Sequence, residues 1–229
     1  MNILIRPKKI LGILIIIIFF LEIANIINLT FYFNNINIKW FYNLFDLNTE
    51  GNIASFYSSI TIFISATLLG FIAFFRKKNN LSYVLWFFLS IVFLFLSIDE
   101  ASQLHERVGV LFEDNLNLTG YLSWAWVVPY GILVIIFSVV YYFKFLPQLP
   151  KKIYWLFIIS GSIYVTGALG FEMLAAKNYN SPLFSEILNA IYYSIEEFLE
   201  MLGIALFIYS LLLYIKEEII ISIKKQPKS

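Results

Sequence analysis

The segment from Ile98 to Arg107 combines the only histidine of the chain with several acidic side chains. Asp99, Glu100, His105 and Glu106 follow an almost wholly apolar run that ends at Ser97. Imidazole and carboxylate groups are the side chains that commonly transfer protons in catalysis, and they also bind divalent cations. This segment is therefore the first candidate for a functional site.

Further acidic residues occur inside two later apolar stretches, at Glu172 and from Glu196 to Glu200. In the three stretches that contain Asp99, Glu172 and Glu196, the acidic residues lie about 20 residues from the basic residues at one end. This separation corresponds to about 30 Å of helix. These acidic residues should reach one level, near the outer boundary of the hydrocarbon. An ionisable group inside a membrane costs a few kcal/mol unless it is paired, hydrated or metal-bound, so we expect these residues to share a site.

Helical periodicity indicates which of these side chains can point the same way. Glu196 and Glu200 are four residues apart and share a face, which suits a two-carboxylate clamp. In a continuous helix Asp99 would share a face with Glu106, whereas His105 would share a face with neither Asp99 nor Glu100. A metal ion would thus need ligands from several helices.

The chemistry that these residue types favour is a divalent metal site that faces the outer side. Carboxylate-rich ligation with one imidazole suits Mn, Fe, Zn, Mg or Ca. Such an ion could activate water, which predicts a metal-dependent membrane hydrolase for a lipid or peptide substrate. The Glu-x-x-His, His-Glu-x-x-His and Gly-x-Ser-x-Gly motifs are absent. The candidate metal ligands are Asp99, Glu100, His105, Glu106, Glu172, Glu196, Glu197 and Glu200.

Two other functions stay open, and whether the chain is an enzyme is not decided at this stage. A cation- or proton-coupled transporter could use a relay made of Glu22, Glu200 and the polar stripe of Ser160, Ser162, Tyr164 and Thr166. A non-catalytic membrane subunit could use the acidic region to dock a protein partner of unknown identity. The plainest alternative is that residues 99–106 have left the membrane and are simply hydrated.

The elements that must position these residues are predicted by composition. The chain has 229 residues, of which 60% are hydrophobic and 14% charged, and this places it in the membrane class. We expect an all-α, polytopic membrane bundle in a single domain over residues 1–229. Six apolar stretches are long enough to cross a bilayer, at about 10–30, 53–75, 81–100, 121–143, 153–174 and 188–215.

Charge distribution predicts the orientation of this bundle. Apart from Lys39, Arg107 and Lys177, every Lys and Arg lies before the first stretch, after the last, or in every second connection. The positive-inside rule then places both termini in the cytoplasm, in a multi-pass protein of the cytoplasmic or plasma membrane. The basic start of the first stretch resembles a signal peptide, but no small-residue cleavage site follows, so we expect this span to be retained.

Composition also limits the partners of the chain. A formal net charge of +1 argues against nucleic acid, and the absence of cysteine removes disulfides and thiolate ligands. Membrane lipid is the expected surrounding, and a lipid, a peptide or a cation from the outer side is the expected substrate.

One pattern of aromatic residues and one pattern of small residues have structural interpretations. Trp124, Trp126 and Tyr130, at the outer end of the fourth stretch, are predicted to anchor the protein at the membrane interface. Ser162, Thr166 and Gly170, at successive spacings of four, are predicted to form a face on which a neighbouring helix packs closely, and Gly161 and Gly167 thin the same helix further.

Overall fold

The computed structural model describes residues 6–36, 38–49, 51–116 and 118–220, with the side chains of 113–116 and 220 left aside. Lys224, Lys225 and Lys228, part of the predicted cytoplasmic charge, lie outside these residues. The described residues form helices, and no strand occurs among them. The predicted all-helical class is confirmed.

Six helical segments are long and apolar enough to cross a membrane. They are α1 (Pro7–Phe33), α3 (Ile53–Lys78), α4 (Val84–Ser102), α6 (Val127–Lys144), α7 (Lys151–Val165) with its continuation, and α9 (Glu186–Tyr214) with its continuation. α7 continues through the π-helix η3 (Thr166–Phe171) into α8 (Glu172–Tyr179), and α9 continues into the π-helix η4 (Ile215–Ile220). The shorter elements are α2 (Lys39–Phe45), α5 (Leu104–Leu116), η1 (Gly120–Leu122) and η2 (Leu146–Gln148).

The fourth span begins later than the sequence predicts. Residues 121–126 do not continue α6 outward, because Gly120 has a φ of 66° and the chain turns through η1 before α6 begins at Val127. This turn carries Trp124 and Trp126 back toward the bundle axis.

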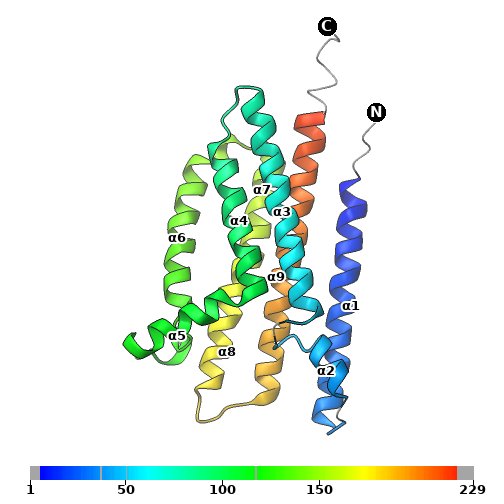
Figure 1. Cartoon of the computed structure of the whole chain (residues 1–229), viewed down its shortest axis with the longest axis vertical. Coiled ribbons are helices and arrows are strands. Elements are labelled where there is room, and N and C mark those ends of the chain that lie inside the picture. Colours follow the sequence, from blue (N-terminus) through cyan, green and yellow to red (C-terminus); the bar gives the residue numbers. More distant parts are fainter. Residues whose placement is uncertain (1–5, 37, 50, 117, 221–229) are drawn as a thin grey trace.

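The helices alternate in direction, so the start of α1 and the end of η4 lie at the same end of the bundle (Figure 1). The α3–α4 and α6–α7 connections lie at this end too, which we call the basic end because it carries Arg76, Lys77, Lys78, Lys151 and Lys152. α2 and α5 lie at the opposite end, which we call the cavity end (Figure 1). That the basic end faces the cytoplasm remains a prediction from charge.

α9 is the helix on which the bundle is assembled, because it packs against α1, α3 and α7. The half of α9 nearer the basic end is almost entirely buried, and its residues Met201, Ile204, Ile208 and Leu211 are at most 3% exposed. The outward faces of the surrounding helices are apolar instead, as at Ile16, Phe74 and Phe143. Apolar side chains both inside and outside are what a bundle surrounded by lipid requires.

A close helix contact joins the α7–η3 segment to α9 at two glycines. A Cβ on Gly167 would lie 2.8 Å from the backbone oxygen of Glu196, and a Cβ on Gly203 would lie 2.8 Å from Tyr164 Cβ. Close backbone approach through small residues is typical of membrane helices. Of the small residues predicted to pack, Ser162 and Thr166 are exposed and Gly170 is half-buried, whereas Gly167 is buried against α9.

The α2–α3 connection holds a buried carboxyl group, Asp46, which is 2% exposed. Its Oδ1 accepts a hydrogen bond from the Asn48 amide at 3.3 Å. Burial raises the pKa of Asp46 above its ordinary value, although hydrogen bonds from Tyr42, Asn48 and Tyr193 oppose this change. The charged form is therefore less stable in the folded protein than in the unfolded chain.

Replacing Gly167 with Ala should weaken the bundle, because the added methyl group has no space against α9. We expect Gly167→Ala to reduce the free energy of unfolding by about 1 to 3 kcal/mol, the usual effect of overpacking. Gly161→Ala is the matched control, since a Cβ at Gly161 meets nothing within 4 Å. Unfolding temperatures in detergent measure both variants, and an equal effect of the two substitutions would contradict the close contact.

Replacing Asp46 with Asn should stabilise the protein in a pH-dependent manner. A carboxyl group whose folded pKa is raised favours folding below its unfolded pKa and loses this advantage as the pH rises through the folded pKa. Asp46→Asn should thus unfold at a higher temperature than the unmodified protein at pH 8, and the difference should shrink toward pH 4. A difference that is constant with pH would show that ionisation of Asp46 is not its cause.

Candidate functional site

A cavity of about 500 Å³ opens near the cavity end of the bundle, between α4, α5, α6, α8 and α9. All eight candidate residues predicted from the sequence line it. Aromatic and aliphatic side chains, together with Asn48 and Asn189, make up most of the remaining wall. The candidate residues are Asp99, Glu100, His105, Glu106, Glu172, Glu196, Glu197 and Glu200.

A break after α4 turns His105 toward Asp99. Gln103 ends α4 in the left-handed region, with a φ of 56° and a ψ of 40°, and α5 then leaves in a new direction. His105 Nδ1 lies 3.2 Å from Asp99 Oδ2. The face assignment expected for a continuous helix is therefore wrong for this pair, because the break at Gln103 changes the relative direction of the two segments.

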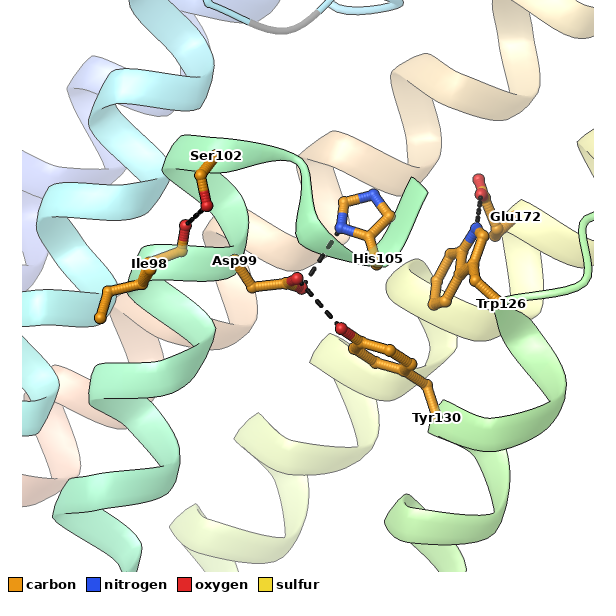
Figure 2. Close-up of polar contacts among 7 residues, drawn as sticks. All are labelled: Ile98, Asp99, Ser102, His105, Trp126, Tyr130 and Glu172. Atoms are coloured by element: carbon orange, nitrogen blue, oxygen red, sulfur yellow. Dashed lines mark hydrogen bonds and ion pairs between the residues drawn. The ribbon is translucent and has the colours of Figure 1, made fainter. Parts of the chain in front are cut away.

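Asp99 is the most enclosed member of this group, with 6% of its surface exposed. The Tyr130 hydroxyl of α6 donates to Asp99 Oδ1 at 3.0 Å, so each carboxyl oxygen has a partner (Figure 2). A buried carboxylate needs such partners to offset its lost hydration. Asp99 thereby fixes the position of His105 and ties α4 to α6.

Trp126 connects this dyad to Glu172. The indole and the His105 imidazole have centroids 4.9 Å apart, and Trp126 Nε1 donates to Glu172 Oε1 at 3.1 Å (Figure 2). Trp124 also lines the cavity. The prediction that Trp124, Trp126 and Tyr130 are interface anchors misses these roles. The spacing of four residues between Trp126 and Tyr130 is the sequence feature that indicates a shared role, since it puts both rings on one helix face.

The π-helix η3 sets the direction of Glu172. A π-helix places more residues in each turn than an α-helix, so the residues after it are rotated relative to a regular continuation. Glu172 is the first residue after η3, and it lines the cavity together with Glu196 on α9, with which its carboxyl group interacts electrostatically. Single π turns are frequent at functional sites.

The Glu172–Glu196 contact limits the chemistry of the cavity. Two neighbouring carboxylates repel each other when both are ionised, and a shared proton or a bound cation would relieve this repulsion. Glu200, one turn deeper on α9, lines the same cavity, as the spacing of four predicts. Its Cγ would lie 3.1 Å from a Cβ at Gly167, so the close helix contact also holds this side chain.

The eight residues share a cavity without forming an evident metal site. Among the residues that the structure describes, no group of three or more His, Cys, Asp or Glu side chains is arranged to hold one ion. His105 instead directs Nδ1 to Asp99, and Glu172 accepts from Trp126. A divalent ion in the cavity is still a proposal, and Glu172 and Glu196 are the residues that would bind it.

The lining of the cavity ends on α9 at Glu200, well short of the basic end. The buried residues of α9 beyond Glu200 are mostly apolar, among them Met201, Ile204 and Ile208, although Ser210 is buried too. Two hydroxyls of the predicted relay donate to their own helix, Thr166 to Ser162 O at 2.7 Å and Ser160 to Phe157 O at 3.2 Å. Glu22, on α1, is not among the residues that line the cavity.

Comparison with known proteins identifies a family for this chain. A family model described as a domain of unknown function (DUF8692) matches residues 10–215, which include every cavity-lining residue. No curated protein and no solved structure matches the chain.

Proposed function

Because this chain belongs to the DUF8692 family, whose description states no function, we propose one from its cavity: a membrane-embedded hydrolase that acts at the cavity end of the bundle. The observation that carries this proposal is the Asp99–His105 dyad in the cavity wall, with Nδ1 and Oδ2 3.2 Å apart. When Nδ1 donates to Asp99, Nε2 becomes the nitrogen that accepts a proton. This is the arrangement of a general base for water.

The Glu172–Glu196 pair supplies the complementary acid. In the proposed reaction His105 Nε2 takes a proton from water, and the resulting hydroxide adds to the carbonyl carbon of an ester or amide. The bond to the leaving oxygen or nitrogen then breaks, and that atom receives the proton shared by Glu172 and Glu196. Separate groups for base and acid, held on different helices, are the usual solution for such a hydrolysis.

A divalent ion at Glu172 and Glu196 would change the source of the activated water but not the location of the reaction. Carboxylate ligands favour Mg, Mn or Ca, and a nearby imidazole favours Fe or Zn. We favour the metal-free form of the proposal, because no three His, Asp or Glu side chains among the described residues are arranged to hold one ion.

The transporter alternative receives less support from the geometry. Its relay would have to cross the apolar layer of Met201, Ile204 and Ile208. The subunit alternative has no observation of its own in its favour.

Replacing His105 should abolish most of the hydrolysis. We expect His105→Gln to lower kcat by roughly 10² to 10⁴-fold, the usual contribution of a general base. The measurement is release of fatty acid or nitrophenol from lipid extract and medium-chain nitrophenyl esters by purified protein in dodecyl maltoside. Asp99→Asn should also lower kcat, because Asn cannot stabilise the protonated imidazole.

Glu186→Gln is the matched control, since Glu186 lies at the same end of the bundle outside the cavity lining. It should leave kcat unchanged. If no lipid, ester or amide is consumed faster by the unmodified protein than by a folded His105→Gln variant, the hydrolase proposal fails.

Chelation separates the two forms of the proposal. We expect activity to persist after dialysis against EDTA, and elemental analysis to find far less than one divalent ion per chain. Loss of activity that Mn or Zn restores, together with loss of bound metal in Glu172→Gln, would establish the metal-dependent form instead.

A further inference from the structure

The charge of the cavity wall favours some head groups of a lipid-like ligand over others. Its described lining residues include seven carboxyl groups and one imidazole, and neither Lys nor Arg is among them. A cleft lined by one sign of charge concentrates ligands of the opposite sign. An anionic phosphate or carboxylate head group would meet repulsion here, whereas a positively charged head group would be attracted.

Aromatic rings stand beside these carboxyl groups. The rings of Trp126 and Tyr130 are 5.4 Å apart and nearly perpendicular, with an interplanar angle of 86°. Each ring is tied to a carboxyl group of the wall, Trp126 to Glu172 and Tyr130 to Asp99. Aromatic faces combined with carboxylates are the usual surroundings of amine and quaternary ammonium groups.

The deeper part of the cavity is apolar on three of its helices. Leu96 lies one turn inward of Asp99 on α4, and Val134 lies one turn inward of Tyr130 on α6. Val165 and Leu169 line the same region from the α7–η3 segment. A hydrocarbon chain can occupy this part while its head group remains among the carboxyl groups.

α6 separates this apolar part from the surrounding lipid. Val134 lines the cavity, while its neighbours Leu133 and Ile135 are 62% and 65% exposed on the outer surface. α6 stands at the edge of the bundle (Figure 1). One helix therefore separates the apolar part of the cavity from the lipid on this side.

We propose that the cavity takes a cationic amphipath, with an amine or quaternary ammonium head group among the carboxyl groups and a single hydrocarbon chain beside α6. This inference rests on the proposed function, because it names the substrate class of the same site. Binding of such a molecule does not itself require hydrolysis, so the two ideas can fail separately.

The test uses dodecyltrimethylammonium brominated near its head group, because bromine quenches the fluorescence of a nearby Trp. The full-length protein is held in neutral dodecyl maltoside micelles, with the surface-exposed Trp40 and Trp155 replaced by Phe. We expect saturable quenching that falls in Trp126→Phe and disappears when Trp124, which also lines the cavity, is replaced by Phe as well. Brominated dodecyl phosphate should give only weak, non-saturable quenching.

Carboxyl substitutions make the test specific. Glu196→Gln and Glu172→Gln should each weaken binding of the ammonium probe by about tenfold, while Glu186→Gln should not change it. Equal quenching by the ammonium and phosphate probes, or tighter binding of the phosphate, overturns the inference. Binding without any hydrolysis leaves the inference intact and defeats the hydrolase proposal, whereas hydrolysis of neutral or anionic lipids without ammonium binding does the reverse.

Discussion

The close contact between the α7–η3 segment and α9 is the constraint on which the cavity depends. Gly167 and Gly203 allow the two backbones to meet, and Glu196 and Glu200 lie at this contact. Membrane helices gain little from apolar burial against each other, so close packing between small residues has to hold them. The position of the acidic side chains is therefore set by backbone contact and not by the side chains themselves.

The cost of burying polar groups explains the remaining contacts of the cavity wall. Asp99 accepts from Tyr130 and faces His105, and Glu172 accepts from Trp126. Each carboxyl group thus recovers part of the hydration that it loses inside the bundle. These same partners give the site a fixed geometry, because a side chain held by two neighbours cannot easily rotate away.

Much of the fold follows from hydropathy and helical rise. Six spans and their alternating direction are readable in the sequence. Counting residues from the basic end of each span predicts that Asp99, Glu172 and Glu196 lie at one level, and all three line the cavity. The local geometry was not readable. The left-handed turn at Gln103 and the π-helix before Glu172 depend on tertiary contacts, because no Gly or Pro marks the first and a regular helix fits the second equally well. Trp126 and Tyr130 were assigned to the interface, since a single sequence does not distinguish an aromatic ring that faces lipid from one that faces a cavity.

The π-helix has a consequence for how relatives of this chain are compared. Removal of one residue from Thr166–Phe171 would shorten the span by only about 1.5 Å, so its hydropathy and topology would be preserved. It would also rotate Glu172 by roughly 100° about the helix axis, away from Glu196. Two proteins could then share every membrane span and differ in whether this carboxyl pair exists. A one-residue gap in an alignment at this point would separate them better than overall similarity does.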